Sequence, residues 1–150
     1  MLKVVRAGHE HLEALIPLFD AYRVFYEQVS DLNAAKSFLV NRIAKNESVI
    51  FLAYDSNTAV GFVQLYATFS SVSLEPFYIL NDLYVTDKFR GKGIGEKLLK
   101  KAKSHCIAMN YKGLALETAK ENPAQNLYQK LNWEKDVDFL HYFWKTSKSK

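Results

Sequence analysis

A glycine-rich turn between an apolar strand and an amphipathic helix holds the residues best suited to chemistry. It reads Arg90-Gly91-Lys92-Gly93-Ile94-Gly95. Glycines let the backbone approach a ligand oxygen closely and adopt angles that are closed to other residues. The start of the following helix presents unpaired N–H groups and a partial positive charge. Because Arg90 and Lys92 add cationic side chains at the same place, the pattern predicts a phosphate or pyrophosphate site.

Two common nucleotide motifs do not describe this turn. A P-loop ends in Gly-Lys-Ser or Gly-Lys-Thr, whereas Gly95 is followed by Glu96 and Lys97. The dinucleotide fingerprint is Gly-x-Gly-x-x-Gly, whereas this chain has Gly-x-Gly-x-Gly. Neither motif therefore fits the three alternate glycines of this turn.

The elements around the turn follow from the hydrophobic periodicity. Helical spacing covers residues 9–26, 32–44 (with Asp31 as N-cap), 94–109 and 123–131. Strand patterns cover residues 48–54, 59–66, 77–85, 114–118 and 137–144, the first two joined by the turn Asp55-Ser56-Asn57. The predicted fold is α/β (α+β), in the order α-α-β-β-β-α-β-α-β, with helices packed on a sheet.

Composition and charge narrow the function classes. With 150 residues, 49% of them hydrophobic, we expect a single domain, ordered from about residue 4 to 145 and ending in a basic tail over 146–150. The longest apolar run, residues 49–54, is far below the roughly 18 residues of a membrane span, and the N-terminus does not resemble a signal peptide. A single cysteine, Cys106, indicates a reducing cytoplasm and excludes zinc sites built from several cysteines.

The net charge of +4 is unevenly distributed, because basic residues outnumber acidic ones between Lys88 and Lys103. A nucleic-acid partner would favour a continuous basic stripe. A cluster confined to the glycine turn and its helix instead suits a small phosphate ligand, so we expect neither a nucleic acid nor a membrane as partner.

Two motifs resemble a known family. Arg90-x-x-Gly93-x-Gly95 resembles the acetyl-CoA signature of the GNAT superfamily of N-acetyltransferases, and the segment from Asn122 to Trp133 resembles its later Asn-x-x-Ala-x-x-x-Tyr-x-x-x-Gly-Phe helix. Asn132 and Trp133 stand where that pattern has Gly-Phe, and asparagine also adopts left-handed angles. Residues 79–85 and 69–71 most resemble the diamine, polyamine and histone-type branch.

The resemblance implies a mixed, mostly antiparallel sheet flanked by helices, and acetyl-CoA as cosubstrate without a metal. It implies that the pyrophosphate binds to the amides of residues 91–95 and that the pantetheine pairs with Leu83 and Val85. The full set of implied cofactor-binding residues is Leu83, Tyr84, Val85, Arg90, Gly91, Lys92, Gly93, Ile94, Gly95, Asn122 and Asn126. Tyr128 matches the family's general acid for the departing thiolate, although it could instead only pack or hydrogen-bond the cofactor.

A base is needed as well, because at pH 7 only about one lysine-type amine in 10³ is neutral. Asp82 is the first candidate, since a carboxylate on an otherwise apolar strand needs a reason, with a structural ion pair or cap as the alternative. Glu117 is the second. We expect the acceptor amine between the first two helices and the loop over 66–75, recognised by Tyr22, Tyr26, Glu27, Glu75 and Asn81.

The predicted function is acetyl-CoA-dependent N-acetyl transfer to a primary amine of a small molecule (a polyamine, a diamine or an amino-acid-like compound) by direct attack in a ternary complex. One alternative is acetylation of protein lysines or N-termini, which needs an open groove. Another is a non-catalytic acyl-CoA sensor. The aromatic closing strand over 137–144 could pair across a homodimer as a sheet edge.

Overall fold

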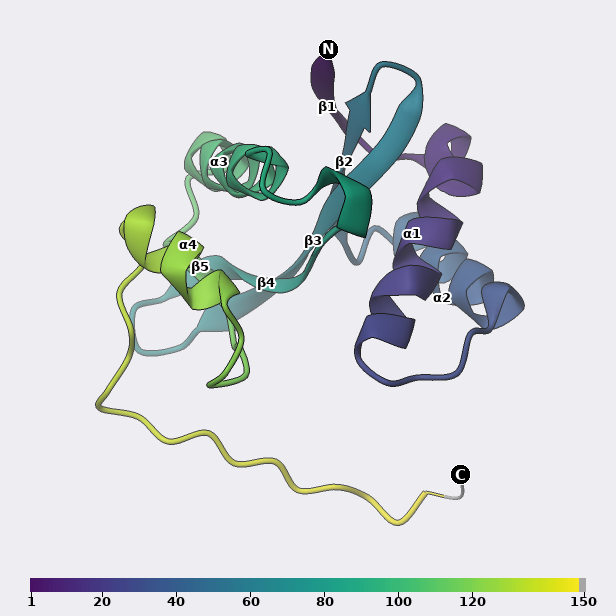
Figure 1. Ribbon diagram of the computed structural model, residues 1–150. Coiled ribbons are helices and arrows are strands. Elements are labelled where there is room, and N and C mark those ends of the chain that lie inside the picture. The colour runs from purple at the N-terminus through teal and green to yellow at the C-terminus, as the bar shows by residue number, and fades with distance from the viewer. Residues whose placement is uncertain (149–150) are drawn as a thin grey trace. The chain divides into compact units, whose positions relative to one another are not determined.

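The computed structural model describes residues 1–148, and Figure 1 traces the chain. The chain forms two compact units, one comprising residues 1–117 and the other beginning at Thr118, and each is described by itself. Residues 149–150, the end of the predicted basic tail, lie outside the described residues.

The first unit is built on a sheet in which β1 (Leu2–Arg6), β2 (Val49–Asp55), β3 (Thr58–Ser70) and β4 (Glu75–Val85) are successive antiparallel neighbours. The short β5 (Leu114–Ala115) pairs in parallel with β4. Within the described residues this makes a mixed, mostly antiparallel sheet of five strands. The prediction of such a sheet is confirmed.

Helices cover both faces of this sheet (Figure 1). The 3-10 turn η1 (His9–His11) leads into α1 (Leu12–Phe25), which packs with α2 (Leu32–Ala44) on one face. There the core contains fully buried Leu15, Leu39, Leu52 and Phe62. On the other face, η2 (Asp87–Phe89) precedes α3 (Ile94–Ala108), which buries Leu98, Leu99 and Ala102.

Two local predictions about these elements are confirmed. The Oδ1 atom of Asp31 accepts a hydrogen bond from the N–H of Ala34 at 3.0 Å, so Asp31 caps α2 as expected. β2 and β3 are joined through Ser56 and Asn57, and Ser56 has a φ of 56°. A positive φ is typical of such tight hairpin turns.

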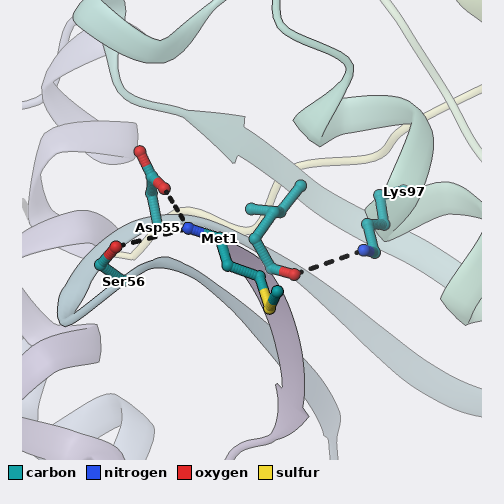
Figure 2. Close-up of polar contacts among 5 residues, drawn as sticks. Met1, Asp55, Ser56 and Lys97 are labelled. Atoms are coloured by element: carbon teal, nitrogen blue, oxygen red, sulfur yellow. Dashed lines mark hydrogen bonds and ion pairs between the residues drawn. The ribbon is translucent and has the colours of Figure 1, made fainter.

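The first strand was not predicted. Leu2 to Arg6 pair with Asp55 to Phe51, and the start of this strand makes polar contacts (Figure 2). The amino group of Met1 lies 3.4 Å from Oδ1 of Asp55, and Nζ of Lys97 donates to the carbonyl of Leu2 at 3.4 Å. These contacts are exposed and contribute little stability. β1 is held mainly by its backbone hydrogen bonds to β2. Its five residues are too few to show a clear strand pattern, and no turn signal precedes them.

In the second unit, α4 (Ala124–Lys130) begins after Pro123, close to the predicted start. The side-chain oxygen of Asn122 accepts a hydrogen bond from the N–H of Ala124 at 2.9 Å. Asn132 has a φ of 68°, so it takes the left-handed conformation expected of it, and the Trp133 N–H donates to the carbonyl of Tyr128 at 3.0 Å.

The predicted order of elements is wrong at its two ends. β1 precedes the helices, and residues 134–148 form neither helix nor strand, so the closing strand over 137–144 is not present. The large apolar side chains of this segment, including Phe139, Tyr142 and Trp144, are exposed. A strand requires a backbone partner, and a run of aromatic residues supplies only the preference for strand geometry. No helix among residues 1–148 has the length and apolar character of a membrane span.

Candidate functional site

A β-bulge in β4 determines where the Asp82 side chain points. Gln64 is opposite Asp82 and Leu65 is opposite Leu80, which leaves Asn81 as an extra residue in β4. Without a bulge, Leu80 and Asp82 would lie on the same face of the sheet. The extra residue shifts the alternation by one, so that Leu80 shares a face with Leu65 while Asp82 shares the opposite face with Gln64.

That opposite face is the one covered by α1 and α2. Phe62, two residues before Gln64, belongs to the core formed with Leu15 and Phe19 of α1. Tyr84, two residues after Asp82, lies 6.5 Å from the Phe62 ring. Tyr78, in contrast, faces α3, since its hydroxyl lies 3.1 Å from Nε2 of His105. The bulge therefore moves the carboxylate from the α3 side of the sheet to the α1 and α2 side.

Asp82 is buried there, with 3% of its surface exposed. Its Oδ2 accepts a short hydrogen bond from Nε2 of Gln64, and its Oδ1 accepts one from Nδ2 of Asn81 at 2.9 Å. Burial raises the pKa of Asp82, while the hydrogen bonds from Gln64, Asn81 and Tyr22 act in the opposite direction. The result is a carboxylate that holds a proton more readily than usual and yet has donors in place for its ionised form.

A cavity of about 330 Å³ opens beside Asp82. Its walls come from α1, α2, β3 and β4, and they comprise Phe19, Tyr22, Arg23, Ala34, Ala35, Phe38, Tyr66, Asn81 and Asp82. Phe19 and Phe38 are stacked, with ring centroids 5.6 Å apart. Burial, and next the charge of Asp82, raise the pKa of both Tyr22 and Tyr66, so both hydroxyls stay protonated at neutral pH. The Tyr22 hydroxyl donates to the carbonyl of Asn81 at 3.3 Å.

This cavity brings together three of the predicted site residues, Tyr22, Asn81 and Asp82, and omits three others. Tyr26 contacts the Tyr22 ring at 5.1 Å but does not line the cavity. Glu27 is exposed after the end of α1, and Glu75 is exposed at the opposite end of β4, where it pairs with Ser70. β3 runs to Ser70 and β4 begins at Glu75, so both strands are longer than predicted. Of residues 66–75, only Tyr66 lines the cavity. The expectation that this segment is a wall-forming loop is therefore wrong.

Sequence reasoning missed several residues of the cavity. Gln64, Tyr66, Arg23, Phe19 and Phe38 were not singled out as site residues. A polar residue within the apolar run of β3 was the available signal for Gln64, by the same argument that selected Asp82. No local pattern distinguishes Arg23 from a solvent-exposed helix residue.

The glycine turn has the conformation that its sequence predicts. Gly91 and Gly93 have φ values of 75° and 82°, and an added Cβ at either position would meet no atom within 4 Å. Gly93 is the N-cap of α3, and no side chain caps that helix start. Gly95 is within the helix. The first N–H groups of α3 and the open backbone before them therefore suit an anion.

Arg90 is engaged in the turn itself. Its Nε donates to the carbonyl of Val85 at 2.8 Å, and its Nη1 lies 2.6 Å from Oδ1 of Asp87. Its guanidinium also lies over the rings of Phe25 and Tyr84. Within the described residues, Lys92 has one cation–π contact, with the Phe89 ring at 5.0 Å. Arg90 thus stabilises the turn, whereas Lys92 extends from it with fewer constraints.

The end of β4 nearest this turn has a backbone edge that β5 does not cover. Within the described residues β5 pairs only with Tyr78 and Ile79, whereas Leu83 and Val85 lie four and six residues further along β4. Such an edge can accept an extended ligand in place of a strand. The expectation that pantetheine pairs with Leu83 and Val85 is compatible with this arrangement.

In the second unit, Tyr128 is half-buried on α4 and contacts the ring of Trp133 at 5.8 Å. Asn122 uses its side-chain oxygen at the start of α4, and Asn126 is exposed one turn later. Across residues 1–148, no group of three or more His, Cys, Asp or Glu side chains is arranged to hold a metal ion.

Comparison with known proteins identifies the family. Residues 12–133 match the model of the acetyltransferase (GNAT) family. The chain is 46% identical over 142 residues to the uncharacterized N-acetyltransferase YhfO of Bacillus subtilis, covering 94% of this chain and 95% of the relative. It is 34% identical over 88 residues to the D-amino-acid N-acetyltransferase HPA3 of Saccharomyces cerevisiae, covering 57% of this chain and 55% of that protein.

A solved structure agrees with these matches. The crystal structure of a probable acetyltransferase superposes with a TM-score of 0.91 at 35% identity, covering 98% of this chain and 99% of the other. With the glycine turn, the α+β sheet and the sequence matches in agreement, the chain belongs to the GNAT family and is an acetyl-CoA-dependent N-acetyltransferase.

Proposed function

We propose that this enzyme transfers the acetyl group of acetyl-CoA to a primary amine of a small molecule bound in the cavity beside Asp82. The observation that carries the proposal is a buried carboxylate, placed by the β4 bulge, in a cavity of about 330 Å³ with aromatic walls. Cavities of roughly 300–1,000 Å³ suit small molecules. The volume of the cavity favours a small acceptor over a protein lysine or N-terminus, for which we would expect an open groove.

Acetyl-CoA fits the residues of the glycine turn. The open backbone at Gly91 and Gly93, the N–H groups at the start of α3 and the side chain of Lys92 would hold its pyrophosphate. The exposed edge of β4 at Leu83 and Val85 would accept its pantetheine. We also assign Arg90, Tyr84, Ile94, Gly95, Asn122 and Asn126 to cofactor binding, as the family motifs imply. Acetyl-CoA supplies the acetyl thioester that the amine attacks.

Asp82 acts as the general base in this proposal. The acceptor enters as an ammonium ion, because an amine with a pKa near 10.4 is almost fully protonated at pH 7. Asp82 takes one ammonium proton before attack, which frees the nitrogen lone pair and leaves a neutral amine. The nitrogen then forms its bond to the acetyl carbon while the C–S bond breaks, and the nitrogen loses its second proton to solvent to give the amide. The raised pKa of Asp82 suits this role, because a stronger base accepts the proton more readily. Gln64 and Asn81 position the carboxylate through their hydrogen bonds.

The departing thiolate takes its proton from Tyr128, which matches the family's general acid. Its half-buried place on α4 beside Trp133 suits a restrained hydroxyl. A tyrosine has a reference pKa near 10 and a thiol near 8.5, so this transfer is uphill by about 2 kcal/mol unless the site lowers the pKa of the tyrosine.

The experiment measures thiol release from acetyl-CoA with a panel of amines, for the wild type and for the Asp82→Asn, Tyr128→Phe and Asp55→Asn variants. Asp55 is a matched control, because its carboxylate contacts Met1 at the β2–β3 turn. We expect turnover of at least one small amine, a loss of about 10²- to 10⁴-fold for Asp82→Asn, and near wild-type rates for Asp55→Asn.

Two results would contradict the proposal. Tight acetyl-CoA binding without turnover of any amine would indicate a sensor domain. Turnover of a basic peptide in preference to every small amine would indicate a protein acetyltransferase. An unchanged rate for Asp82→Asn would show that Asp82 is not the base, but it would leave the proposed acceptor class unaffected.

A further inference from the structure

We infer that the acceptor amine carries a carboxylate, which Arg23 binds, and an apolar side chain, so that the substrate class is an apolar or aromatic amino acid. This inference rests on the proposed function, because it concerns the same cavity. It selects one member of the three acceptor classes that the sequence left open.

The charged residues that line the cavity match the two charges of an amino acid. Among the described residues that line it, Asp82 is the single acid and Arg23 the single base. A polyamine or diamine has a second ammonium group that would need a second acid and would be repelled by Arg23. Neither Glu27 nor Glu75 lines the cavity. A zwitterion, with one ammonium for Asp82 and one carboxylate for Arg23, matches the two opposite charges.

Arg23 has donors left for a ligand. Its Nη1 makes a long hydrogen bond of 3.5 Å to the carbonyl of Val29, and within residues 1–148 no ion pair of Arg23 is closer than 4.0 Å. The nearby acid Asp20 already accepts from Oγ of Ser30 at 2.6 Å and from the N–H of Asp31 at 2.8 Å. Because a guanidinium carries five N–H donors in a planar fork, Arg23 can bind a carboxylate through two of them.

The other arginine near the cavity is already paired. Arg42 lies over the Phe38 ring at 4.6 Å, and its Nε lies 2.9 Å from Oε1 of Glu47. It does not line the cavity. Arg23 is therefore the cation that a bound carboxylate would meet.

The walls define the rest of the acceptor. The stacked rings of Phe19 and Phe38, with Ala34 and Ala35 of α2, give the cavity an apolar wall. Contact with such a surface removes an aliphatic or aromatic side chain from water, which favours binding. A sugar with several hydroxyl groups would lose hydrogen bonds to water there without replacing them.

The test compares matched amines by kcat/KM with acetyl-CoA saturating: L- and D-phenylalanine, L-leucine, phenylalaninamide, phenethylamine and spermidine. Phenethylamine is phenylalanine without its carboxylate, so the ratio between them isolates that group. We expect an amino acid to exceed phenethylamine by about 10- to 100-fold, as hydrogen bonds to a charged group allow. Arg23→Gln should reduce kcat/KM for the amino acid and leave phenethylamine within about twofold, and Arg23→Lys should restore part of the loss.

Arg6→Gln is the matched arginine control, because Arg6 lines a different cavity with His105 of α3. This inference would be overturned if spermidine or phenethylamine were acetylated as fast as the amino acids. It would also be overturned if Arg23→Gln reduced kcat/KM equally for the amino acid and for phenethylamine. The proposed function would stand in both cases. Failure to acetylate every amine despite acetyl-CoA binding would overturn the proposed function itself, and this inference with it.

Discussion

Replacing Gln64 with leucine tests whether Asp82 is a base tuned by its neighbour. Gln64 has no exposed surface, and its Nε2 donates to Oδ2 of Asp82 directly across the β3–β4 pair. Its Oε1 is buried and has no hydrogen-bond partner within the described residues. Leucine has a similar volume and no donor, so Gln64→Leu removes one hydrogen bond from the carboxylate and also removes the unpaired acceptor.

The expected kinetic effect depends on pH. The bond from Gln64 favours the ionised carboxylate and lowers the pKa of Asp82, so its removal raises that pKa further. A hydrogen bond to a charged group contributes about 1.5–3 kcal/mol. On the acid side of the pH profile kcat/KM should therefore fall by about 10- to 100-fold, at about 1.4 kcal/mol per tenfold. At alkaline pH both enzymes have an ionised Asp82, and their rates should converge.

The stability of the Gln64→Leu variant should depend on pH in the opposite way to its activity. The folded-state pKa of Asp82 is raised, so ionising this group costs stability as the pH rises through that range. Gln64→Leu makes the ionised form more costly, so its stability relative to the wild type should be lower at an alkaline pH, where Asp82 is ionised, than at an acid pH, where Asp82 is protonated. At the acid end the variant should match or exceed the wild type, because the unpaired Oε1 is gone. Urea unfolding at the two pH values measures this difference.

The assay is steady-state thiol release with the best amine from pH 5.5 to 10, for the wild type, Gln64→Leu, Asp82→Asn and the double variant. If the two residues act through one hydrogen bond, Gln64→Leu should change kcat/KM by less than about twofold when Asp82 is already asparagine. A decrease of the same size at every pH, or the same decrease in the Asp82→Asn background, would refute the reasoning.

Three further predictions concern the scaffold, and equilibrium unfolding tests each of them. Gly61→Ala should cost about 1–3 kcal/mol, because its Cβ would lie 2.7 Å from the carbonyl oxygen of Tyr84; Gly113→Ala, with no atom within 4 Å of the new Cβ, is the control, and equal losses would contradict the packing argument. Asp31→Ala should cost about 1 kcal/mol by removing the cap of α2, whereas Asp31→Asn should retain most of the stability. Leu39→Ala should cost about 2–5 kcal/mol, since Leu39 is fully buried between the helices and the sheet, and a loss below about 1 kcal/mol would place it outside the core.

The sequence by itself determined the features that depend on a few neighbouring residues. The cap at Asp31, the hairpin turn over Asp55-Ser56-Asn57, the positive φ of Gly91 and Gly93 and the left-handed Asn132 were all predictable, because each is a backbone preference of the residue in its local setting. The glycine turn and the helix after it were sufficient to predict a phosphate ligand, and together with the segment from Asn122 to Trp133 they predicted the family.

Only the tertiary structure decided which side chains meet. Strict alternation along β4 would place Asp82 with Tyr78 and Leu80 on the α3 side. One extra residue at Asn81 reverses the face and places the carboxylate beside Gln64, in the cavity that Arg23 also lines. A bulge depends on the register with β3, from residues far away in the chain, so no local pattern reveals it. A pairing partner distant in the sequence likewise decides whether a strand forms. β1 forms because β2 is available to pair with it. The aromatic residues over 137–144 form no strand despite their preference for one.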